Sequence, residues 1–136
     1  MTDINNVKVL NRGIRAFGPI QGESIGFIPA VRFGGTVTQA TSKGTAVTLN
    51  RFTGAITTHN ASLAAAASIT FIVNNSIVRA TDTVVVAVRS GSVVGRYTAA
   101  VTAVANGSFQ VTLTNVGAVA SEVVVINFAV INSVQN

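Results

Sequence analysis

From residue 36 onward, short runs rich in Val, Ile and Thr are separated by turn signals, and this pattern constrains the fold most strongly. These residue types favour the pleated, half-buried surface of a sheet. The segment Phe109-Gln110-Val111-Thr112-Leu113-Thr114 alternates strictly, which places every second side chain on one face. Asn106-Gly107 before it fits a type I′ hairpin turn, which needs a positive φ at both residues. The regular spacing of such runs predicts an all-β protein: an antiparallel, jelly-roll-like β-sandwich.

About eight strands are expected in this sandwich. The predicted strands span residues 36–41, 45–50, 54–58, 68–74, 83–89, 95–105, 108–114 and 122–132. The one helix-prone stretch is the alanine-rich segment 61–67, for which Asn60 could serve as the N-cap. This stretch is too short to form an isolated helix. We therefore expect a single helical turn or a loop over the end of the sandwich.

Two of the predicted strands are apolar on both faces. Residues 83–88 and 123–131 show no polar alternation, and their β-branched residues favour a strand over a helix. In a two-layer sandwich, one face of each sheet should meet water. We therefore expect the outer face of these strands to contact a neighbouring subunit. The predicted subunit-interface residues are Val85, Val124, Ile126 and Phe128.

The chain carries little charge for its size. Nine basic and four acidic residues make up 10% of 136 residues, and 49% of the residues are hydrophobic. A soluble domain usually has about 25% charged residues. A domain of this size buries only about two-thirds of its unfolded surface, so few charges leave apolar surface exposed. This balance predicts a subunit of an assembly.

The first 35 residues differ in composition from the rest. They hold four of the nine basic residues and both prolines, Pro19 and Pro29, and they show neither a helical nor a strand period. Proline and glycine there prevent a regular ladder or helix. The sequence therefore predicts an extended arm over residues 1–35 and a β-sandwich oligomerisation domain over residues 36–136. The arm would lie across another surface or, alternatively, wrap its own domain.

The net charge of +5 raises the possibility of a nucleic-acid partner. The basic residues, however, are scattered singly and are not interleaved with aromatic residues as a stacking platform requires. An acidic protein surface is the better expected partner, and no nucleic acid is predicted. The apolar stretch 116–131 is too short for a membrane span and contains Glu122. The N-terminus lacks the pattern of a signal peptide, so neither a membrane segment nor an export signal is expected.

The sequence offers little for catalysis or metal binding. There is no cysteine, His59 is the only histidine, and no nucleophile-elbow motif occurs. A glycosidase needs two carboxylates about 5–10 Å apart. Asp82 and Glu122 could meet if their strands are neighbours, but structural pairing with Arg79 or Arg89 is expected instead. We therefore predict no enzyme and no cofactor. One alternative stays open: a trimer could bring three copies of His59 to one axis and bind an ion there.

Seven blocks of the β region follow a pattern shared with virion proteins of tailed bacteriophages. The blocks are Gly34-Gly35-Thr36-Val37-Thr38-Gln39-Ala40-Thr41-Ser42-Lys43, Val47-Thr48-Leu49-Asn50, Gly54-Ala55-Ile56-Thr57, Phe71-Ile72-Val73-Asn74-Asn75-Ser76, Ala80-Thr81-Asp82-Thr83-Val84-Val85-Val86, Gly107-Ser108-Phe109-Gln110-Val111-Thr112 and Asn127-Phe128-Ala129-Val130-Ile131. Together they resemble β domains of small head-decoration proteins and of the ends of phage fibres, over residues 34–131. The resemblance implies a homotrimer located in the virion, on the exterior of the capsid.

Within this class, the chain looks most like a capsid decoration, or cement, protein. A fibre usually carries a long repetitive shaft, and no such shaft is found here. The resemblance implies binding to the major capsid protein, with the arm lying over the joints between its subunits. The alternative is the tip domain of a head fibre or tail fibre that binds a host receptor; sugar-binding tips usually expose Trp or Tyr, and this chain has no Trp and one Tyr. The implied capsid-contact residues are Lys8, Arg12, Arg15, Phe17, Ile20, Phe27 and Arg32.

Overall fold

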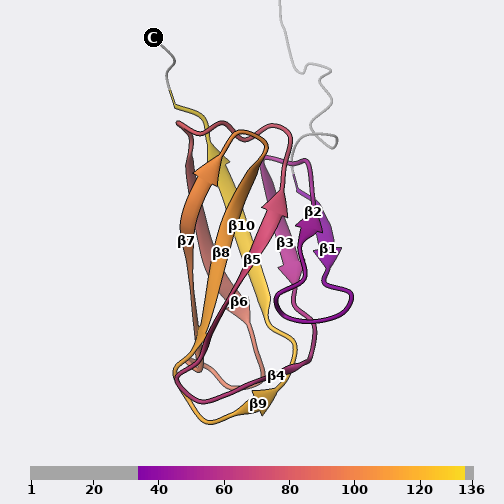
Figure 1. Ribbon diagram of the computed structural model, residues 1–136, viewed down its shortest axis with the longest axis vertical. Helices are drawn as coiled ribbons and strands as arrows, with labels where there is room; N and C mark the ends of the chain where they lie inside the picture. Colours follow the sequence, from indigo (N-terminus) through magenta and orange to yellow (C-terminus); the bar gives the residue numbers. More distant parts are fainter. Residues whose placement is uncertain (1–33, 134–136) are drawn as a thin grey trace, which may run out of the picture. The chain divides into compact units, whose positions relative to one another are not determined.

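Two four-stranded sheets face each other in the computed structural model, which describes residues 34–133 (Figure 1). The strands are β1 (Thr36–Thr38), β2 (Val47–Thr48), β3 (Thr53–Thr57), β4 (Ser62–Leu63), β5 (Ser68–Asn74), β6 (Thr83–Ser90), β7 (Tyr97–Ala105), β8 (Ser108–Asn115), β9 (Ala120–Ser121) and β10 (Val125–Ile131). No helix occurs among these residues, so none that could cross a membrane is found there. The predicted all-β sandwich is confirmed.

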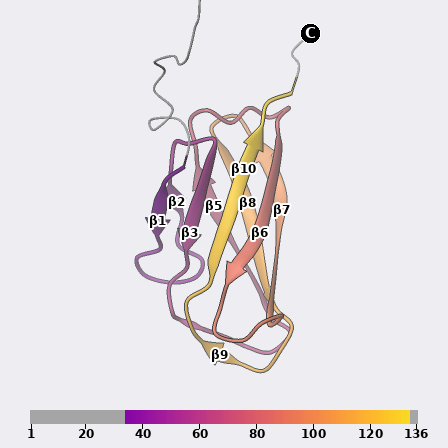
Figure 2. The ribbon, with the colours of Figure 1, turned by 180° about the vertical axis from the view of Figure 1, so that it is seen from behind.

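The strand order defines a first sheet, β1-β3-β10-β6, and a second sheet, β2-β5-β8-β7. Most neighbouring strands are antiparallel, as predicted, but β1 pairs with β3 and β2 pairs with β5 in parallel. A small ribbon of β4 and β9 closes one end of the sandwich (Figure 1). Seen from behind, β10 lies between β3 and β6 (Figure 2). Each of the eight predicted strands corresponds to a strand of the two large sheets.

Two local predictions need refinement. Within the alanine-rich stretch 61–67, Ser62 and Leu63 form strand β4, and a turn follows in which Ala66 has a φ of 60°. Asn106-Gly107 does connect β7 to β8. Only Gly107 has a positive φ there, of 83°, so the predicted type I′ turn is wrong. The glycine alone supplies the left-handed conformation that the connection needs.

The core lies between the two sheets and is formed by alternate residues of their strands. Phe109 of β8 and Phe128 of β10 meet across the sandwich, with ring centroids 5.3 Å apart and planes tilted by 56°. Gly54 of β3 lies directly opposite Phe128 in the first sheet. A Cβ atom at Gly54 would lie 2.8 Å from Phe128 Cε1, so the glycine leaves space for the aromatic ring. The largest fully buried apolar side chains are Phe71, Phe109, Ile56, Leu113, Ile126, Val73, Val111 and Val124.

Candidate functional site

The outer face of the first sheet is built from small side chains with little charge. Along β6, Val84 and Val86 point toward the core, whereas Val85 and Ala87 point outward because strand side chains alternate. Ala87 pairs with Asn127 of β10, which in turn pairs with Ala55 of β3. These residues therefore form a continuous row across the sheet, in which Ala87 and Asn127 are exposed and Ala55 is 7% exposed.

An open hollow of about 750 Å³ lies over this face. We call it the outer hollow; Ala55, Ala87, Asn127 and Ala129 belong to its lining, together with Gly34 and Arg89. The three alanines have short side chains, so a partner could approach the backbone of the sheet closely. Asn127 is exposed and brings an amide into a lining whose other polar side chains are Thr36, Thr53 and Arg89.

The outer face of the second sheet has a different chemistry. Ser68 and Thr114 join their hydroxyl groups across β5 and β8 at 2.7 Å, and Thr70 and Thr112 do the same at 2.7 Å. Thr112 also contacts the hydroxyl of Thr102 on β7 at 3.0 Å. Such cross-strand hydroxyl pairs suit a surface that faces water. The two faces of the sandwich are therefore unequal, and the first sheet carries the apolar one.

Five of the seven charged residues between residues 34 and 133 are buried or only partly exposed. Asp82 is 7% exposed, Lys43 is 3% exposed, and the side chain of Glu122 is 10% exposed. Between residues 34 and 133, only Arg79 and Arg89 among the acidic and basic residues are classed as exposed. This part of the chain thus presents no exposed carboxylate and two exposed guanidinium groups.

The two described carboxylates have structural partners of their own. Asp82 accepts hydrogen bonds from the backbone amides of Arg79 at 2.9 Å and Ser133 at 3.1 Å, and from the Asn132 side chain at 3.1 Å. These hydrogen bonds, that from Arg79 foremost, lower the pKa of Asp82. Glu122 pairs instead with Arg96. The strand register sets Asp82 and Glu122 at opposite ends of the β6–β10 pair, so they do not form a catalytic carboxylate pair.

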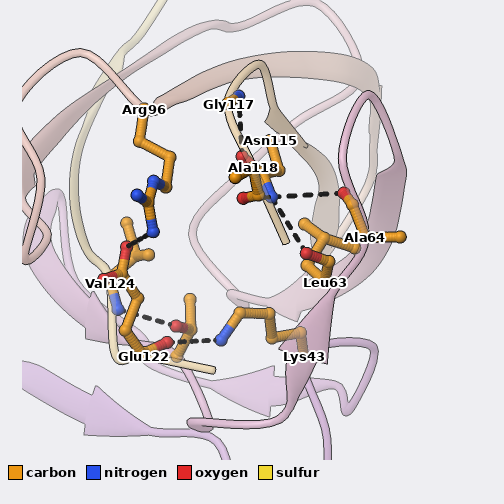
Figure 3. A network of polar contacts seen from close by, with 10 residues as sticks. Lys43, Leu63, Ala64, Arg96, Asn115, Gly117, Ala118, Glu122 and Val124 are labelled. Carbon is orange, nitrogen blue, oxygen red and sulfur yellow. Dashed lines mark hydrogen bonds and ion pairs between the residues drawn. The ribbon is translucent and has the colours of Figure 1, made fainter. Parts of the chain in front are cut away.

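Glu122 is held from two sides at the β4–β9 end of the sandwich (Figure 3). Its backbone carbonyl accepts a hydrogen bond of 2.6 Å from Lys43 Nζ, which also donates to the His59 carbonyl. Its carboxylate Oε2 lies 3.9 Å from Arg96 Nη1. Burial lowers the pKa of Lys43, and the charge of Glu122 partly opposes this effect. Through these contacts, Lys43 links the segments that contain His59 and Glu122, and Glu122 also pairs with Arg96. The cluster exposes no reactive group.

Tyr97 is buried next to this cluster. Burial raises the pKa of Tyr97, and the nearby Glu122 carboxylate raises it further. Neither the Tyr97 hydroxyl nor Glu122 Oε2 makes a hydrogen bond. Both atoms are shielded from solvent, so a ligand could not reach them without a rearrangement. We read this cluster as structural.

Asn115 forms a second polar network at the same end (Figure 3). Its side-chain amide nitrogen donates to the carbonyls of Leu63 at 2.9 Å, Ala64 at 3.2 Å and Ala118 at 2.8 Å. Its side-chain oxygen accepts from the Gly117 amide at 2.9 Å. The residue is fully buried. One side chain therefore connects the end of β8 to the β4 segment and to the loop before β9.

The predicted interface residues fall into two groups. Val85 is 47% exposed on the outer face of the first sheet and lines the outer hollow. Val124, Ile126 and Phe128 point the other way and fill the core, with exposures of 0%, 0% and 4%. Because strand side chains alternate, the outward residues next to them are Val125, Asn127 and Ala129. Val124, Ile126 and Phe128 therefore lie in the core and not on the surface where they were expected. The adjacent residues of the strand occupy that surface instead.

Of the other predicted sites, only His59 lies within the described residues. His59 is partly buried, and its Nδ1 accepts a hydrogen bond from the Ala61 amide at 3.0 Å. No group of three or more His, Cys, Asp or Glu side chains that could hold a metal occurs within residues 34–133. The other predicted residues lie outside the described residues, as does nearly all of the predicted arm 1–35. These are Lys8, Arg12, Arg15, Phe17, Ile20, Phe27 and Arg32.

Comparison with known proteins found no matching family model, no matching curated protein and no matching solved structure.

Proposed function

We propose that this chain is a structural protein of a tailed-bacteriophage virion, a decoration protein that binds the outer surface of the major capsid protein shell as a homotrimer. The observation that carries the proposal is the lack of surface charge on the sandwich. Neither described carboxylate is exposed, and the outer face of the first sheet carries an open hollow whose lining is mainly apolar. Covering such a face on a larger assembly removes apolar surface from water, which is favourable by about 25 cal/mol per Å².

A repeated shell surface suits this mode of binding. Specific protein interfaces bury about 800 Å² on each partner. A trimer would engage three equivalent sites at once, and linked binding events raise the overall avidity by about 10²–10⁴. The resemblance of residues 34–131 to phage virion β domains supports this class of partner. In this proposal the protein acts as a clamp between shell subunits and catalyses no reaction.

The alternative, a receptor-binding fibre tip, receives less support. Sugar-binding sites commonly stack a ligand on an exposed aromatic ring. Tyr97 is the only tyrosine of the chain, which has no tryptophan, and it is 6% exposed. The described sandwich therefore offers neither ring for stacking.

The test uses undecorated shells of the phage whose genome encodes this chain. The full-length protein is mixed with the shells, and bound protein is measured by co-sedimentation, while light scattering gives the mass of the free protein. The proposal expects saturable binding, a trimeric mass and a higher melting temperature of the decorated shells. A monomer that does not sediment with the shells would refute it.

A further inference from the structure

The outer hollow of the first sheet combines an apolar lining with one exposed positive charge. We propose that it is the docking site for a segment of a different protein that presents apolar side chains together with one carboxylate, which pairs with Arg89. This inference rests on the proposed function, because it names the face through which the protein would contact the shell. It adds the site and the chemistry of the partner segment.

The lining residues define what the partner segment must look like. Ala55, Ala87 and Ala129 leave room for apolar side chains of the partner to reach the sheet. Asn127 is exposed between them and can both donate and accept a hydrogen bond. A partner backbone or polar side chain opposite Asn127 would therefore satisfy an amide that docking removes from water.

Arg89 determines which charge the partner segment must carry. It is exposed, it lines the hollow, and it forms no ion pair with any residue in the described part of the chain. Covering a guanidinium group without a partner is costly, because a buried charge must be paired. A carboxylate can accept two parallel hydrogen bonds from arginine, which is a strong and directional match. The partner segment is therefore acidic at the position that faces Arg89.

A second copy of the sandwich does not meet this requirement. Asp82 and Glu122 are both buried and already engaged, so residues 34–133 of another copy would offer no exposed carboxylate to Arg89. Pairing two such faces would instead bury Arg89 against apolar and hydroxyl groups. The remaining acids, Asp3 and Glu23, lie outside the described residues, and docking through them is an outcome that the experiment must separate.

The absence of cysteine makes a site-specific crosslinking test possible. The full-length Ala87→Cys variant carries a thiol-directed photo-crosslinker in the outer hollow, and the Thr70→Cys variant carries it on the opposite face as a matched control. Each is bound to the undecorated shells and irradiated, and the crosslinked products are identified by mass spectrometry. We expect position 87, and not position 70, to crosslink to an acidic segment of the major capsid protein. Crosslinks from position 87 to this chain itself, within one copy or between two copies, would overturn the proposal, and so would equal crosslinking from both positions.

Affinity measurements test the role of the charge. Arg89→Gln should weaken binding to the shells at least tenfold, because it leaves a partner carboxylate covered and unpaired. The matched variant Arg79→Gln removes the other exposed arginine and should change the affinity less than twofold. Equal affinities for the two variants would overturn the docking proposal while leaving the decoration function intact. If the native chain itself fails to bind the shells, the proposed function and this inference both fail.

Discussion

Replacing Asn115 by alanine should destabilise the end of the sandwich that is closed by β4 and β9. The substitution removes four hydrogen bonds, to the carbonyls of Leu63, Ala64 and Ala118 and from the Gly117 amide. Each contributes about 1 kcal/mol, and a buried carbonyl left without a donor costs about 1–3 kcal/mol. The Leu63 carbonyl is the buried one. With about 1 kcal/mol for each of the other three bonds, we expect Asn115→Ala to lower the free energy of unfolding by about 4–6 kcal/mol, a large part of the roughly 5–15 kcal/mol typical of a domain.

Urea unfolding followed by far-ultraviolet circular dichroism measures this loss. With a denaturant slope of about 1.5 kcal/mol per M, the midpoint should fall by about 3–4 M. The matched control is Asn74→Ala, because Asn74 is exposed at the end of β5; this variant should stay within about 0.5 kcal/mol of the native chain. If the two variants lost similar amounts of free energy, the network around Asn115 would not hold this end together.

The nearly isosteric change Asn115→Asp separates lost hydrogen bonds from lost volume. It keeps an acceptor for the Gly117 amide but turns an oxygen toward three carbonyls. Only the protonated acid can donate there, so the pKa of the new carboxyl should be raised in the folded state. Relative to the native chain, the variant should be most stable below the unfolded-state pKa of about 3.9 and should lose stability as the pH rises. A loss of stability that is independent of pH would refute this account.

Three further predictions concern the core and the titrating groups. Gly54→Ala places a Cβ 2.8 Å from Phe128 Cε1 and should lower the free energy of unfolding by about 1–3 kcal/mol in thermal melts; an unchanged melting temperature would contradict the packing. Tyr97→Phe removes a buried hydroxyl that makes no hydrogen bond, so urea titration should show equal or higher stability, and a loss above about 1 kcal/mol would reveal a missed partner. The Arg79 amide and its companion donors lower the folded-state pKa of Asp82, so its stabilising contribution is complete above the unfolded value of 3.8 and is lost as the pH falls below it. In acid unfolding, the Asp82→Asn variant should not show the loss of stability that Asp82 causes in the native chain below this pH. If the stability of both proteins fell equally with decreasing pH, this account would be contradicted.

The strands were predictable because the alternation of apolar and polar residues, the β-branched composition and the turn residues all indicate the same segments. Residues 108–114 alternate cleanly, and the match to β8 is close. The β4–β9 ribbon was not predicted, because each strand has only two residues and their pairing joins segments far apart in the chain. The turn type at Asn106-Gly107 was also missed, since the dipeptide permits more than one backbone conformation and the flanking strands select one.

The candidate site was predictable only in outline. The doubly apolar runs did indicate that strands β6 and β10 have an apolar outer face. The phase was marked by a single residue, Asn127, which is the one polar side chain in the run 123–131. Once Ile126 and Phe128 are known to point inward, Asn127 and Ala129 must face outward. The role of Asn115 had no signal in the sequence, because its amide donates to the backbone carbonyls of Leu63 and Ala64, which lie about fifty residues away in the chain.

The central position of β10 in the first sheet determines when that sheet can be completed during synthesis. The hairpin of β7 and β8 is local and can form as soon as both strands emerge from the ribosome, whereas the first sheet lacks a middle strand until β10 has been made. Pairing strands that are far apart in the chain is slow. Asn127 and Ala129, which lie on β10, line the outer hollow. A chain whose translation stops before β10 would therefore lack the outer hollow, and with it the face that we propose as the docking site.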